Sequence, residues 1–155
     1  MRTVAFLAAV LLVNLPVVAQ APAWEGSWRL DLARSEFVPA PAPYVRGTRR
    51  IETSGSSLRI VEDFVRPRGG LIHLEWNGQP DGRDYRVHGV DLFVTYAYRQ
   101  IDGRTLEGTV KVDGVVTSTS RETISADGQM LTVVTIGQHA QAGVKTTMRF
   151  TRLRS

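Results

Sequence analysis

The chain has 155 residues, no cysteine and a formal net charge of +4, and 43% of its residues are hydrophobic. Without cysteine the domain cannot rely on disulfides, so packing and sheet hydrogen bonds must hold it together. The basic residues are scattered among acids, and the short clusters Arg49-Arg50 and Arg66-Pro67-Arg68 are not interleaved with aromatic residues. We therefore expect no binding to nucleic acid.

Residues 1–21 have the pattern of a secretory signal peptide. Arg2 supplies a positive charge, residues 4–13 are apolar, and Ala19-Gln20-Ala21 supplies the small residues that signal peptidase reads. The apolar run is shorter than the roughly 20 residues that span a bilayer. We expect cleavage after Ala21, which leaves residues 22–155 as one periplasmic or secreted domain without stable membrane insertion. A retained membrane anchor is the alternative.

Short runs that alternate between apolar and polar residues fill the rest of the chain. In residues 24–32, Trp24, Gly26, Trp28 and Leu30 share one face, which predicts a strand with one buried side. The same reasoning predicts further strands at 45–53, 58–65, 71–77, 85–88, 92–101, 104–112, 115–124, 130–137 and 144–153.

The connections between these strands favour hairpins. Asp102-Gly103, Asp113-Gly114 and Asp127-Gly128 suit type I′ turns, in which both central residues have positive φ. Consecutive hairpins make neighbouring strands antiparallel, and closure into a barrel removes the exposed edges. We predict an all-β, antiparallel up-and-down β-barrel of about 8–10 strands. The proline-rich residues 33–43 predict an extended connector with at most one helical turn, and therefore no helical lid.

The tripeptide Gly26-Ser27-Trp28 in the first strand resembles the calycin superfamily of lipocalins and fatty-acid-binding proteins, and small exported bacterial domains described as lipocalin-like. In those families the tryptophan packs across the closed end of the barrel. The resemblance therefore implies structural, barrel-closing roles for Gly26 and Trp28, and we expect an arginine of the last strand to cover the ring. Arg152 is favoured because it shares its face with Phe150. The apolar register places Arg149 outside, so the family's Arg-x-Tyr carboxylate site is not expected.

Several polar residues fall in the apolar register and should face the interior. Arg49, Glu62 and Glu122 are charged, so each must pair, contact water or meet a ligand, because burying an unpaired charge costs several kcal/mol. The apolar side chains expected to line a hollow interior are Leu30, Val94, Leu106, Val133 and Met148, and the polar ones are Arg49, Tyr96, Tyr98 and Ser120. The residues expected to leave space are Gly47, Gly108, Ser118 and Ser120.

No motif indicates catalysis or a metal site. His73, His88 and His139 lack metal-ligand spacing, and there is no Gly-x-Ser-x-Gly sequence. We expect no cofactor, although the calycin resemblance leaves a haem held by one histidine as an alternative. We expect a non-enzymatic protein that binds a small hydrophobic or amphipathic, lipid-like or fatty-acid-like ligand. Its cavity residues would be Arg49, Tyr96, Tyr98, Ser120 and Met148. The alternative is a ligand-free scaffold that binds another envelope protein or a glycan.

Overall fold

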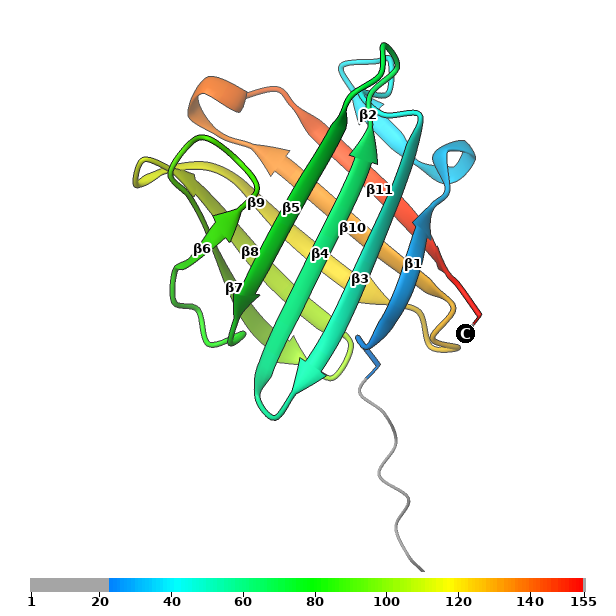
Figure 1. The fold of residues 1–155 in the computed structure, drawn as a ribbon, viewed down its shortest axis with the longest axis vertical. Coiled ribbons are helices and arrows are strands. Elements are labelled where there is room, and N and C mark those ends of the chain that lie inside the picture. The colour runs from blue at the N-terminus through cyan, green and yellow to red at the C-terminus, as the bar shows by residue number, and fades with distance from the viewer. Residues whose placement is uncertain (1–22, 155) are drawn as a thin grey trace, which may run out of the picture.

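The fold is a closed antiparallel β-barrel, seen in a computed structural model that describes residues 23–154 (Figure 1). Ten strands close the barrel in the order β1-β3-β4-β5-β6-β7-β8-β9-β10-β11, because β11 pairs back onto β1. This confirms the predicted up-and-down barrel without a helical lid. The predicted signal peptide and its cleavage site lie outside the described residues.

The strand bounds agree with the alternating runs of the sequence to within a few residues, except that the first strand is shorter than predicted. The barrel strands are β1 (Gly26–Leu30), β3 (Arg46–Ser54), β4 (Ser57–Val65), β5 (Leu71–Gly78), β6 (Tyr85–His88), β7 (Val94–Asp102), β8 (Thr105–Val112), β9 (Val115–Ile124), β10 (Met130–Gly137) and β11 (Lys145–Arg152). Two short 3-10 helices complete the structure, η1 (Leu32–Arg34) and η2 (His139–Gln141). No helix among residues 23–154 is long and apolar enough to cross a membrane.

The proline-rich connector contains a strand that the sequence analysis missed. After the single turn η1, strand β2 (Glu36–Val38) pairs with the start of β11, where Val38 lies opposite Lys145. Because β1 pairs only with the last residues of β11, from Phe150 to Arg152, the earlier backbone groups of β11 are free to pair with β2.

Only one of the three Asp-Gly dipeptides has the predicted turn geometry. Asp113 and Gly114 both have positive φ, at 49° and 81°. The prediction was wrong at Asp127-Gly128, where only Gly128 has positive φ and the Asp127 carboxylate accepts a hydrogen bond from the Gln129 amide. It was also wrong at Asp102-Gly103, because β7 continues to Asp102 and a bulge between Gln100 and Asp102 shifts the turn by one residue.

The two ends of the barrel differ. The lower end in Figure 1 carries the β3–β4, β7–β8 and β9–β10 hairpins, and the upper end carries the β4–β5 and β8–β9 hairpins, the β6–β7 loop, η2 and β2. Fully buried apolar side chains fill the interior from the middle towards the lower end, namely Trp28, Ile51, Leu106, Leu131 and Phe150. The lower half of the barrel is therefore a packed core.

Candidate functional site in the barrel interior

A network of buried polar side chains crosses the middle of the barrel. Arg49 of β3 donates from Nη1 to Glu62 Oε1 on β4, at 2.9 Å, and from Nη2 to Glu122 Oε2 on β9, at 2.7 Å. The hydroxyl of Tyr98 on β7 donates to Glu122 Oε1 at 3.0 Å. Arg49 and Glu62 meet because they are paired across neighbouring strands, whereas Glu122 reaches Arg49 across the barrel. We call these four residues the central network.

The central network contains one cation and two carboxylates. Burial opposes the charge of Arg49, but Glu122 and Glu62 outweigh it and hold the pKa of the guanidinium well above its usual range. Burial raises the pKa of the Glu62 carboxyl, Arg49 reduces this rise and the charge of Glu122 adds to it. The interior therefore carries more negative than positive charge when both carboxyls are ionised.

Glu62 is the member of the network that remains accessible. Its side chain is 12% exposed, against 2% for Arg49 and 1% for Glu122. Glu62 Oε1 accepts from Arg49, while Oε2 accepts no hydrogen bond from residues 23–154. The Arg49 Nε–H also has no partner among these residues, but it is fully covered. Glu62 Oε2 is thus the polar atom of the network that another molecule can reach.

Aromatic and apolar side chains surround the network on the side of the upper end. Tyr44 stacks on Phe64 with 4.4 Å between ring centroids, and Tyr96 packs edge-on against Tyr98 at 6.0 Å. Burial raises the pKa of both Tyr44 and Tyr96, and in both the charge of Glu62 adds to the rise. Other partly exposed apolar side chains packed against the core here include Ile72, Leu74, Val94 and Met148.

The structure brings the predicted cavity residues to the same interior. Arg49 and Tyr98 belong to the central network, Tyr96 packs on Tyr98, and Ser120 lies beside Gly108, the strand partner of Tyr98. Met148 is paired with Val133, which in turn is paired with Glu122. That these residues contact a ligand stays a prediction. Sequence reasoning placed Arg49, Glu62 and Glu122 in the interior but did not predict that Arg49 pairs with both carboxylates, and it missed Tyr44, which precedes β3.

The small residues expected to leave space do not do so at two positions. A Cβ on Gly47 would meet the Phe64 ring at 2.6 Å, and one on Gly108 would collide with the Ser120 hydroxyl and meet the Tyr98 ring at 3.1 Å. Both glycines therefore make room for neighbouring side chains, and that expectation was wrong for them. Ser118 and Ser120 are partly exposed.

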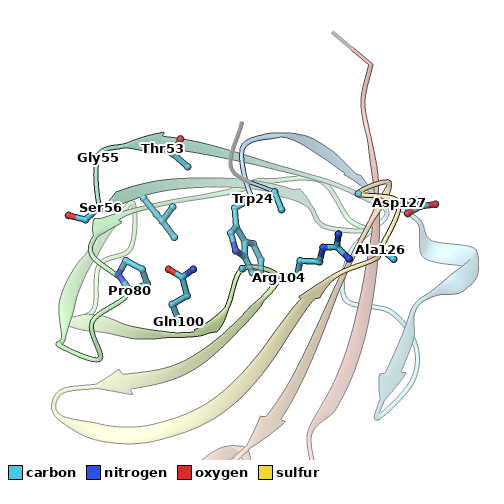
Figure 2. A pocket seen from close by; sticks show the side chains of 13 residues that line it. Trp24, Thr53, Gly55, Ser56, Pro80, Gln100, Arg104, Ala126 and Asp127 are labelled. Carbon is cyan, nitrogen blue, oxygen red and sulfur yellow. The ribbon is translucent and has the colours of Figure 1, made fainter. Parts of the chain in front are cut away.

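A hollow lies at the lower end, outside the predicted cavity. It has a volume of about 650 Å³ and is lined by turn residues and by the buried Trp24, which lies between Gln100 and Arg104 (Figure 2). The Trp24 Nε1–H has no hydrogen-bond partner among the described residues. None of the five predicted cavity residues lines this hollow.

The histidines do not form a metal site in the described part of the chain. His73 contacts Asp63 at 2.7 Å, and both side chains are about half exposed on the outer face. No group of three or more histidine, aspartate or glutamate side chains among residues 23–154 is placed to hold a metal ion.

The comparisons with known proteins find similar solved structures but no family. No family model matches the chain, and no curated protein matches it. The redesigned β-barrel mFAP1, solved bound to DFHBI, is similar with a TM-score of 0.47 and 13% sequence identity, over 84% of this chain and 95% of that one. At this level the likeness carries no information about what this chain binds.

Proposed function

We propose that the protein is an exported, non-enzymatic β-barrel that binds a small amphipathic ligand in its interior. The apolar body of the ligand would lie among the side chains of the upper half, and its polar end would meet Glu62. The observation that supports this is a buried carboxylate with one oxygen that has no partner among residues 23–154, next to partly exposed aromatic rings. Apolar walls with a few placed polar groups are typical of small-molecule sites.

The charge balance of the central network indicates the nature of the polar end. Glu62 and Glu122 share one cation, so a ligand carboxylate would bring a third negative charge into the interior. An amine or another hydrogen-bond donor would instead donate to Glu62 Oε2, the oxygen that accepts no hydrogen bond from residues 23–154. Tyr44 and Tyr96 would add favourable contacts between their ring faces and a cation. This narrows the lipid-like ligand expected from the sequence to a cationic or donor-bearing amphiphile rather than a fatty acid.

A displacement experiment tests this function. The neutral dye N-phenyl-1-naphthylamine is bound first, and decylamine, decanoate and decanol then compete below their micelle concentrations. We expect decylamine to displace the dye at a concentration at least about tenfold lower than decanoate. The Glu62→Gln variant should lose this preference. The control is Glu75→Gln, which removes a carboxylate paired with Arg59 on the outer face and should keep it.

The outcomes separate the parts of the proposal. If no dye binds at tens of micromolar, the barrel is not a container for such ligands. If the dye binds but decanoate competes as well as decylamine, the proposal of an interior binding site is kept and the proposed preference for a cationic ligand is rejected.

One observation favours the ligand-free scaffold as the second candidate. The hydrogen bonds within the central network and the rings that fill the space at Gly47 and Gly108 form a packed interior. A groove of about 440 Å³ on the outer face of β8, β9 and β10, lined by Thr109, Thr119 and Ile136 among others, would then be the surface for a partner. Failure of every interior probe, together with loss of partner capture in Ile136→Ser, would favour this candidate.

Two parts of the proposal, export and membership of the calycin superfamily, rest on the sequence. Residues 1–21 support export, and Gly26-Ser27-Trp28 supports the membership. Intact-mass measurement of protein recovered from the native envelope should give a chain that begins at Pro22. Full-length chain in the membrane fraction would contradict cleavage after Ala21 and favour a retained membrane anchor.

A further inference from the structure

The exposed large apolar side chains of the described residues gather at one end of the barrel. Nine such side chains are exposed, and seven of them belong to the upper end. These seven, which we call the apolar rim, are Val38, Val45, Leu71, Leu92, Phe93, Val115 and Ile136. The lower end and its neighbourhood hold only Ile101 and Leu153 among the nine.

The topology places the apolar rim on separate connections around the upper end. Val45 precedes β3 and Leu71 begins β5, next to the β4–β5 turn. Leu92 and Phe93 lie in the loop before β7, and Val115 begins β9. Val38 and Ile136 both lie next to Lys145 at the start of β11, since each is its pairing partner. The rim is therefore a ring of single side chains on loop tips and strand ends.

Basic residues accompany the apolar rim. Arg46, Arg66, Arg68, Arg86 and Lys145 are exposed at the same end. None of the five forms an ion pair within residues 23–154. The Arg86 guanidinium lies over the Phe93 ring, 5.2 Å from its centroid, so an apolar and a basic group meet directly.

The acids of the upper end do not balance these charges. Asp91 and Asp113 are exposed there without an ion pair, while Glu36 is held by Arg149 at 3.6 Å and Asp84 by Lys111 at 2.7 Å. Five unpaired basic groups therefore face two unpaired acids. The result is a surface that is both apolar and positive.

We propose that the upper end docks the barrel on an anionic lipid bilayer. The apolar rim would enter the interface between headgroups and acyl chains, and the five basic residues would contact the phosphates. Apolar side chains gathered at one end together with unpaired arginine and lysine suit interfacial binding, in which burial of apolar groups and attraction to anionic headgroups act together. The docking does not depend on the proposed ligand, and it would turn the accessible side of the interior towards the membrane.

Vesicle binding tests this proposal with residues 22–155, whose described part is a closed barrel with its own core, so that the apolar residues 1–21 do not contribute. We expect sedimentation with vesicles of phosphatidylglycerol and phosphatidylcholine, with a partition coefficient at least about tenfold above that for phosphatidylcholine alone. Raising the salt from about 0.05 M to about 0.5 M should weaken it, because the headgroup attraction is screened. The double variant Arg66→Gln with Arg68→Gln should lose most of the preference for the anionic lipid.

Matched variants locate the contact on the barrel. Leu92→Ser with Phe93→Ser should lower the partition coefficient about tenfold, whereas Ile101→Ser with Leu153→Ser, at the other end, should leave it unchanged. Leu92→Trp should show a blue-shifted emission on vesicles and Ile101→Trp should not, since the native tryptophans are all buried. Circular dichroism checks that each variant is folded.

Three results would overturn the proposal. These are absence of vesicle binding, equal loss of binding in the variants of the two ends, and a Leu92 and Phe93 variant that abolishes a concentration-dependent dimer while vesicle binding is unchanged. The last result would assign the apolar rim to a second copy of the chain.

Discussion

Arg152 lies over the indole ring of Trp28, with its guanidinium carbon 4.1 Å from the ring centroid. The same guanidinium donates to the Ala23 carbonyl at 2.6 Å, to the Gly128 carbonyl at 2.7 Å and to the Glu25 carbonyl. One side chain thus joins the segment before β1 to the β9–β10 hairpin, above a fully buried ring. This contact ties these segments together at the lower end of the barrel, and a barrel-closing role for it stays a prediction.

The first prediction concerns Trp28 itself. Trp28→Ala removes a ring that is 0% exposed and leaves a cavity beneath Arg152, so the free energy of unfolding should fall by about 3–5 kcal/mol. Urea denaturation followed by circular dichroism measures it. The control is Ile101→Ala, which truncates a side chain that is 43% exposed and should cost less than about 0.5 kcal/mol. A loss below about 1 kcal/mol for Trp28→Ala would contradict the predicted barrel-closing role of Trp28.

The second prediction concerns Gly26, which lies under Arg152. Its φ of 145° disfavours other residues, and an added Cβ would collide with the Arg152 guanidinium. Gly26→Ala should therefore lower the free energy of unfolding by about 1–3 kcal/mol. Gly103→Ala is the matched control, because an added Cβ there meets nothing and the turn does not need positive φ. Equal unfolding midpoints for the two variants would show that Gly26 is not needed for the contact.

The sequence predicts the strands because a period of two decides which face is buried, and this pattern is local. The burial of Trp28 and the outward position of Arg149 follow from that period alone. The pairing of Arg49 with Glu122 does not follow from that period, because closure of the barrel brings the two side chains together. Closure depends on the tilt and stagger of the strands. Strand β2 was missed because alternate prolines conceal a three-residue strand whose pairing depends on β11.

The space inside the barrel also could not be predicted from the sequence. A glycine in the apolar register is compatible either with a hollow or with a neighbouring ring, and the pattern cannot distinguish them. The Phe64 ring occupies the position at Gly47, and the Ser120 hydroxyl and the Tyr98 ring occupy it at Gly108. Such packing depends on side-chain rotamers of neighbouring strands, which local alternation does not fix.

The third prediction concerns the cation of the central network. Arg49→Leu leaves Glu62 and Glu122 buried without a positive partner, so the free energy of unfolding at neutral pH should fall by about 3–5 kcal/mol. Part of the loss should return on mild acidification, because burial raises the pKa of the Glu62 carboxyl, which then takes up a proton. The triple variant with Glu62→Gln and Glu122→Gln should also recover much of the stability. If the triple variant is no more stable than Arg49→Leu, the loss comes from packing rather than charge.

The fourth prediction concerns the hydroxyl of Tyr98. Tyr98→Phe keeps the ring against Trp76 and Tyr96 but removes the hydrogen bond to Glu122, which should cost about 1–3 kcal/mol because the acceptor is a buried carboxylate. Tyr85→Phe serves as the control, since its hydroxyl donates to the exposed carboxylate of Asp81. Thermal unfolding of both variants measures the difference. Equal decreases in the unfolding temperature of the two variants would show that the buried hydrogen bond contributes no more to stability than the exposed one.

The last prediction is a dependence of stability on pH that Glu62 controls. Burial raises the pKa of Glu62 above its usual value of 4.5, so the folded state binds more protons than the unfolded state between that value and the raised one. Unfolding free energy should therefore decrease as pH rises through this window. Below it, stability should also decrease, because exposed carboxyls such as Asp102, Glu107 and Asp127 have lowered pKa values and lose their hydrogen bonds or ion pairs when protonated.

The variant Glu62→Gln tests whether Glu62 causes the decrease in stability that is expected as pH rises above the usual carboxyl pKa. The amide keeps the shape of the side chain and removes the charge, so the variant should be more stable than the parent at neutral pH and should lack the decrease above the usual carboxyl range. Glu75→Gln should retain that decrease, because burial is not what sets the pKa of Glu75, which its bond to Arg59 lowers. Urea titrations between pH 4 and pH 9 give the two profiles. Identical curves for Glu62→Gln and the parent would mean that Glu62 carries no uncompensated charge, and the reason for expecting a cationic ligand would then be lost.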